Sequence, residues 1–77
     1  MEHKNIYWNM YADVWAYHQK YINSLQDDDK FWHRLVEDGR TVARKYNNNR
    51  FINNLVVNEM AEFENVYEKK HKQDMPL

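Results

Sequence analysis

Residues 7–25, with the sequence YWNMYADVWAYHQKYINSL, decide the fold of this chain. Their apolar and aromatic side chains recur in three columns with a seven-residue step: Tyr7/Val14/Tyr21, Trp8/Trp15/Ile22 and Tyr11/His18/Leu25. At about 100° of rotation per residue, these columns share roughly 140° of one helical face. The pattern therefore predicts an amphipathic helix that packs against other helices.

Two polar breaks divide the rest of the chain. Residues 26–29 (QDDD) offer an Asp that can cap the following helix. Residues 47–49 are three asparagines, which tolerate the left-handed conformation and also cap helices. We therefore expect helices at about 5–25, 28–46 and 50–71, with a frayed tail over 72–77. Short connections make neighbouring helices antiparallel. The predicted fold is one all-α domain over residues 1–77, an up-down-up three-helix bundle.

The second and third columns of the first helix are expected to face the core of this bundle. Folding the chain about its two breaks places Trp15 opposite Gly39, which is the single glycine of the chain. A glycine there would leave room for the indole ring. The same folding places His18 near Glu59, and a buried histidine requires such a hydrogen-bond partner.

The first helix carries more apolar surface than a three-helix bundle needs. Met10 and Tyr17 widen its apolar arc to about 180°, whereas a bundle helix covers about 100–140°. We expect the surplus on an exposed edge formed by Tyr7, Met10, Val14, Tyr17 and Tyr21. Tyr and Met are favoured at interfaces. This edge predicts a non-enzymatic interaction protein that binds a protein partner or forms a homo-oligomer. Scattered surface tyrosines, or a site for a small amphipathic ligand, are the alternatives.

A basic segment supports a different function. Within residues 31–50, Glu37 and Asp38 are the only acidic residues. A phosphate-contacting patch in a small nucleic-acid-binding accessory protein would consist of Arg40, Arg44, Lys45 and Arg50. The alternative is charge pairing with the acidic third helix. A net charge of −1 gives the chain no overall attraction to nucleic acid or to an anionic membrane.

Motifs for catalysis or metal binding are scarce. The chain has no cysteine, no glycine-rich phosphate loop and no Ser/His/Asp arrangement. Glu59 and Glu62 form an E-x-x-E that could hold magnesium for phosphohydrolysis, but only with a second carboxylate pair on a neighbouring helix. Glu68 and His71 match one copy of the E-x-x-H motif of di-iron bundles, which need two. We therefore expect no enzyme, no cofactor and no catalytic or metal-binding residue.

The apolar runs also bear on location. None approaches 18 residues, and no apolar signal region follows the N-terminus. The absence of cysteine is compatible with a reducing compartment. We expect a cytoplasmic protein that does not bind membranes.

Several short motifs carry a family resemblance. WAYHQKY at 15–21, DKFW at 29–32, KY at 45–46 and FINNL at 51–55 resemble short helical proteins of Firmicutes and their mobile elements. The resemblance covers residues 8–68, and its motifs consist of packing residues. It implies an origin and a helical fold. Because that group has no assigned activity, it carries no functional residue over to this chain.

Overall fold

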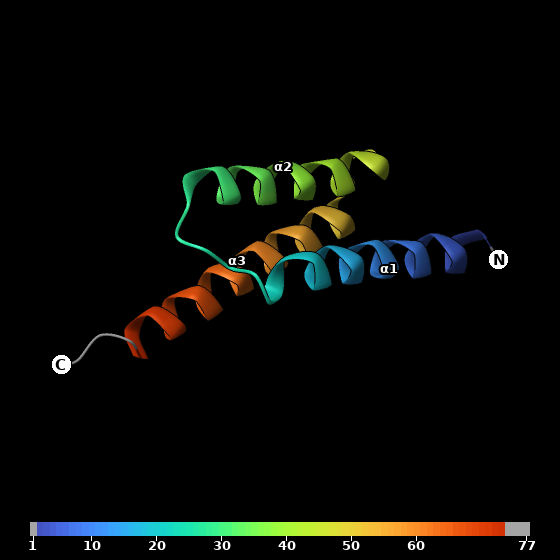
Figure 1. Ribbon diagram of the computed structural model, residues 1–77. Helices are drawn as coiled ribbons and strands as arrows, with labels where there is room; N and C mark the ends of the chain where they lie inside the picture. Colours follow the sequence, from blue (N-terminus) through green and yellow to red (C-terminus); the bar gives the residue numbers. More distant parts are fainter. Residues whose placement is uncertain (1, 74–77) are drawn as a thin grey trace.

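The computed structural model describes residues 2–73, with the side chains of residues 6–70. It contains three helices, α1 (Glu2–Ile22), α2 (Asp29–Lys45) and α3 (Arg50–Gln73). α2 runs back along α1, and α3 runs in the same direction as α1, so that each helix packs against the other two (Figure 1). The predicted all-α, up-down-up three-helix bundle is confirmed.

The predicted breaks end and start the helices through specific hydrogen bonds. Asp28 caps α2, because its side chain accepts a hydrogen bond of 3.1 Å from the backbone N–H of Lys30. Asn47 and Asn48 adopt the left-handed conformation, with φ of 59° and 55°, and so turn the chain out of α2. Asn49 then caps α3, since its Oδ1 atom accepts a 2.9 Å hydrogen bond from the N–H of Ile52.

Two helix ends differ from the expected bounds. α1 ends at Ile22 rather than near residue 25. A turn follows the helix, in which the N–H of Ser24 donates a 3.1 Å hydrogen bond to the carbonyl of Tyr21. α3 continues to Gln73, past the expected end at 71. The rest of the predicted frayed tail, residues 74–77, lies outside the described residues.

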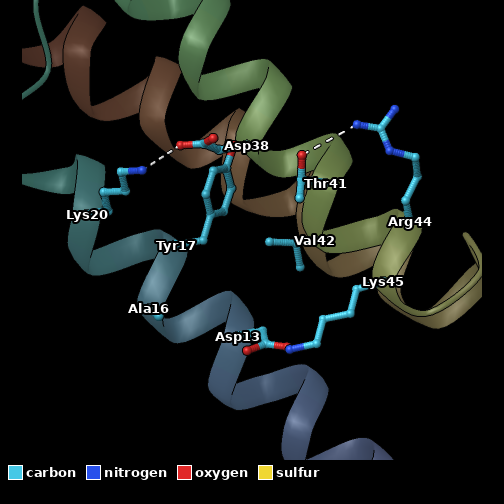
Figure 2. Close-up of a pocket in the computed structure, with 9 residues that line it drawn as sticks. All are labelled: Asp13, Ala16, Tyr17, Lys20, Asp38, Thr41, Val42, Arg44 and Lys45. Atoms are coloured by element: carbon cyan, nitrogen blue, oxygen red, sulfur yellow. Dashed lines mark hydrogen bonds and ion pairs between the residues drawn. The ribbon is translucent and has the colours of Figure 1, made fainter.

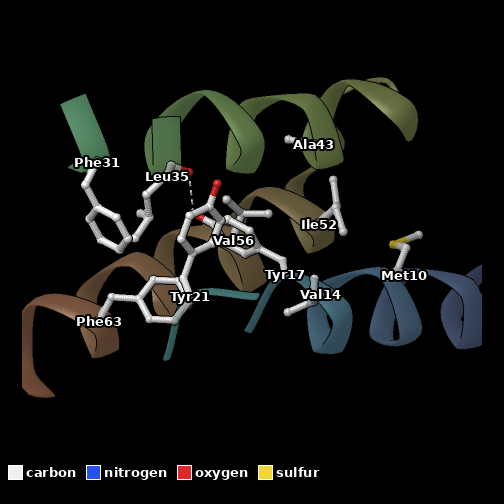
Figure 3. Packing of buried hydrophobic residues seen from close by; sticks show 10 residues of the cluster. All are labelled: Met10, Val14, Tyr17, Tyr21, Phe31, Leu35, Ala43, Ile52, Val56 and Phe63. Atoms are coloured by element: carbon white, nitrogen blue, oxygen red, sulfur yellow. Dashed lines mark hydrogen bonds between the residues drawn. The ribbon is translucent and has the colours of Figure 1, made fainter. Parts of the chain in front are cut away.

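The core lies between the three helices and draws on all of them (Figure 3). Four of its side chains are fully buried: Met10 from α1, Leu35 from α2, and Ile52 and Phe63 from α3. The other buried members are Val14, Tyr17, Tyr21, Phe31, Ala43 and Val56. Large aromatic rings therefore supply much of the apolar burial in a chain that is close to the lower size limit for a stable domain.

The bundle is longer than a compact domain of its size. Its Cα radius of gyration is 14.3 Å, against about 11.5 Å for a compact chain of this length. The principal extents are 53 × 21 × 18 Å. The N-terminal part of α1 and the C-terminal part of α3 project past the other helices at opposite ends (Figure 1). Side chains on these projecting ends have neighbours on fewer sides than those in the middle.

Candidate functional site

The exposed edge predicted for the first helix is largely inside the protein. Met10, Val14, Tyr17 and Tyr21 are all buried, and only Tyr7, with 49% of its surface exposed, lies where that prediction placed it. The prediction of an exposed edge is therefore wrong for four of the five residues. α1 is rotated by roughly 100° about its axis relative to the expected orientation.

Hydrogen-bonding partners on α2 account for this rotation. The Tyr17 hydroxyl donates a 2.8 Å hydrogen bond to the carbonyl of Leu35 (Figure 3). The Tyr21 hydroxyl donates one to Asp38. Burial raises the pKa of the Tyr17 phenol, so this hydroxyl keeps its proton. Gly39 makes room for Tyr17 rather than for Trp15, since a Cβ atom at position 39 would lie 2.8 Å from the Tyr17 Oη atom. A tyrosine ring fills the core, and its hydroxyl still reaches a polar partner.

The same rotation exposes side chains that were expected in the core. Trp8 is 72% exposed, Trp15 59% and Tyr11 53%, so the core assignment is wrong for these three residues. The later members of the two columns, including His18, are half-buried. The exposed side chains follow one side of the N-terminal two-thirds of α1. The α1 aromatic face, as we call this surface, consists of Tyr7, Trp8, Tyr11 and Trp15, whereas the exposed Ile6 lies about 180° around the helix from Trp15.

α3 supports the α1 aromatic face along one flank. The rings of Tyr7 and Tyr11 meet the ring of Phe51 edge-on, with centroids 5.0 and 5.6 Å away. Trp15 stacks on His18 with a centroid distance of 5.3 Å and an interplanar angle of 11°. The His18 Nδ1 atom in turn lies 2.7 Å from the Glu59 Oε1 atom, which confirms the predicted pairing of these residues. The rings of Tyr7, Tyr11 and Trp15 are therefore held in place by contacts on their inner side.

A second surface feature is a groove of about 630 Å³ between α1 and α2 (Figure 2). An ion pair crosses each end: Lys45 to Asp13 at 2.9 Å, and Lys20 to Asp38 at 2.8 Å. Val42 lies between them on the α2 side. The two pairs fasten α1 to α2, and all four charges are satisfied within the chain. The groove thus stabilises the observed rotation of α1 and presents no unpaired lysine or aspartate.

The ionisation of both aspartates agrees with this bonding. Burial by itself would raise the pKa of Asp13, but hydrogen bonds from Tyr46 and Lys45 hold it below its ordinary value. Hydrogen bonds from Lys20 and Tyr21 likewise lower the pKa of Asp38. Both carboxylates therefore remain charged at neutral pH and keep their partners.

The four basic residues proposed to contact nucleic acid do not share one face. Arg40 and Arg44 are exposed on the outer side of α2, where Arg40 pairs with Glu37 at 3.2 Å. Lys45 lies about 100° around the helix from Arg44 and is paired with α1. Arg50 is the first residue of α3. Nucleic-acid binding stays a prediction, and the structure places Arg40 and Arg44 together on one face of α2.

The candidate metal ligands are also not gathered. In the described part of the chain, no three or more His, Asp or Glu side chains lie together where they could hold a metal ion. Glu59 is engaged by His18, and the Glu62 side chain is exposed. The side chain of His71, the second residue of the E-x-x-H motif, lies outside the described residues.

Comparison of the chain with protein-family models, with curated proteins and with solved structures finds no match. Over the described residues, no helix is both long and apolar enough to cross a lipid bilayer. The α1 aromatic face is therefore the principal surface whose composition calls for a functional explanation. One sequence signal could have located it: between residues 5 and 19, Asp13 is the only Asp, Glu, Lys or Arg. A solvent-facing helix normally carries more charge.

Proposed function

We propose that this protein is a non-enzymatic interaction protein that assembles with copies of itself through the α1 aromatic face. The observation that carries the proposal is the exposure of Trp8, Tyr11 and Trp15 along one side of a single helix. Single exposed apolar side chains are normal on soluble proteins, but a contiguous apolar patch marks an interaction surface. Trp and Tyr are also the residues that most often dominate binding energy at interfaces.

The size of the patch supports pairing of two copies. From the exposed fractions of its four side chains, the α1 aromatic face presents about 600 Å², at the upper end of what monomers expose. Two such faces together would bury about 1,000 Å² or more once neighbouring atoms are included, which is the lower bound for a specific interface.

The scarcity of charge on this side of α1 favours a second copy over a charged partner. Asp13, the one Asp, Glu, Lys or Arg between residues 5 and 19, faces α2 and is paired with Lys45. A self-complementary interface places identical side chains near one another, so any charge on it would meet its like. Between residues 9 and 19, the exposed side chains of α1 other than Trp15 are asparagine, tyrosine, alanine and glutamine, which impose no such repulsion.

The experiment is multi-angle light scattering of the purified chain at concentrations up to about 100 μM, because interfaces of standard size range from micromolar to picomolar affinity. We expect a mass of at least twice the 9.6 kDa of the chain. The double variant Trp8→Gln/Trp15→Gln should shift the mass to that of the monomer while the helical circular dichroism signal is retained.

Val57→Gln is the matched control, because Val57 is 63% exposed but lies in the groove between α2 and α3. It should leave the mass of the assembly unchanged. A monomeric wild-type chain over the whole concentration range would overturn the proposal. So would a double variant that assembles as the wild type does, or a Val57→Gln variant that dissociates equally.

A further inference from the structure

The outer face of α1 has two flanks of different character. Trp8 and Trp15 lie on the flank towards α3, where Trp15 stacks on His18. Ala12 and Ala16 are exposed on the flank towards α2. Ala12 lies about 40° around the helix from Trp8 and about 60° from Trp15. Along the helix axis, the exposed Ala12 lies between the two exposed tryptophans. Its small side chain leaves room for another helix to approach the backbone of α1 closely.

We infer that two copies pair with their α1 helices antiparallel and crossing near Ala12, so that Trp8 of each copy lies beside Trp15 of the other. This inference rests on the proposed self-association and specifies its geometry. The midpoint between Trp8 and Trp15 along the helix falls between Tyr11 and Ala12, so one two-fold axis there relates both tryptophan pairs.

The two flanks decide between antiparallel and parallel pairing. A two-fold axis perpendicular to α1 brings the same flank of both helices together, so that the aromatic side chains of the two copies merge into one cluster. An axis along α1 would instead set the aromatic flank of one copy against Ala12 and Ala16 of the other. The parallel arrangement would leave part of each indole exposed to water and bury neighbouring amide side chains without partners.

The projecting end of α1 supports the same choice. The N-terminal end of α1 extends past the ends of α2 and α3 (Figure 1), and Trp8 lies between Tyr7 and Tyr11, which contact Phe51 at the start of α3. In an antiparallel pair this end lies alongside the middle of the second copy, where Trp15 and the supporting helix α3 are located. In a parallel pair the two projecting ends could cover only each other. Antiparallel packing also opposes the helix dipoles, which is the favourable orientation.

Single cysteines provide the test, because the natural chain has none. With the axis between residues 11 and 12, two copies of position 12 lie within about 2 Å of each other along the helix direction, but two copies of position 19 lie about 22 Å apart. A disulfide requires Cα atoms within about 7 Å. Under mild oxidation, Ala12→Cys should therefore form a covalent dimer in most of the protein, and Gln19→Cys should not. Thr41→Cys, exposed on α2, is the control for random collision.

The outcomes separate this inference from the proposed function. A wild-type chain that is monomeric by light scattering would overturn both. A wild-type dimer in which Gln19→Cys cross-links as well as Ala12→Cys would overturn the antiparallel geometry and leave self-association standing. A dimer in which neither variant cross-links above the Thr41→Cys background would overturn the assigned crossing point.

Discussion

Gly39→Ala is the substitution that most directly tests how α1 is oriented in the bundle. The added Cβ atom would lie 2.5 Å from the Met60 Cε atom, 2.8 Å from the Tyr17 Oη atom and 3.0 Å from the Val56 Cγ1 atom. The end of the methionine side chain is flexible and can move away. Tyr17 cannot move easily, because it is buried and its hydroxyl is bonded to the Leu35 carbonyl.

Two opposing effects set the magnitude. Overpacking a buried site costs about 1–3 kcal/mol, and replacing glycine by alanine within a helix returns about 1 kcal/mol. We expect Gly39→Ala to lower the free energy of unfolding by about 1 kcal/mol, which lowers the Tm of a domain of this size by about 4–8 °C. Thermal and urea unfolding, followed by far-ultraviolet circular dichroism at one fixed protein concentration, would measure the change.

Tyr17→Phe identifies the neighbour that is responsible. Alone it removes one hydrogen bond, at a cost of about 0.5–1.5 kcal/mol. It also removes the atom that the new Cβ would meet. In the Tyr17→Phe background, Gly39→Ala should therefore cost markedly less than in the wild type, and the two effects should not add. A Gly39→Ala variant as stable as the wild type, or fully additive effects, would refute the assignment of Gly39 as the space for Tyr17.

Two further predictions concern how the stability of the fold depends on pH. Because hydrogen bonds from Lys20 and Tyr21 hold the pKa of Asp38 below its ordinary 3.8, its stabilising contribution is complete above that pH and is lost as the pH falls through the lower, folded value. Asp38→Asn should flatten the acid side of a plot of urea midpoint against pH, and an unchanged acid slope would contradict this role. Burial and the hydrogen bond to Asp13 raise the pKa of Tyr46 to about 12, so its contribution is lost as the pH rises from 10 towards 12. Tyr46→Phe should remove one late-ionising phenol from an alkaline absorbance titration, and an unaltered late step would argue against that bond.

Features that depend on neighbouring residues in the chain were predictable. Asp28 lies just before a run with helical periodicity, and the asparagines at 47–49 tolerate left-handed backbone, so both breaks could be located from local chemistry. The pairing of His18 with Glu59 was also predictable, because two short turns fix the height at which residues of the first and third helices meet. The positions of the two breaks, and the height at which His18 meets Glu59, do not depend on how α1 is rotated about its axis.

The rotation of α1 was not predictable in the same way. Apolar side chains cover about half of its circumference, so hydrophobic periodicity allows several orientations that bury similar area. The choice depends on atoms distant in the chain: the Leu35 carbonyl and Asp38, which accept hydrogen bonds from two tyrosines, and the space left by Gly39. A buried hydroxyl without a partner is costly, so these few contacts select one among orientations that bury similar apolar area.

The amino-acid sequence by itself determined three amphipathic helices, their breaks and their up-down-up order, because capping and periodicity act over a few residues. Only the tertiary structure decided which side of α1 faces the core and, as a result, which aromatic side chains remain at the surface. That decision arises from hydrogen bonds and close packing between α1 and α2. The two tyrosine hydroxyls bond to residues that lie 18 and 17 positions further along the chain. It moves the candidate interaction surface from Met10, Val14, Tyr17 and Tyr21 to Trp8, Tyr11 and Trp15.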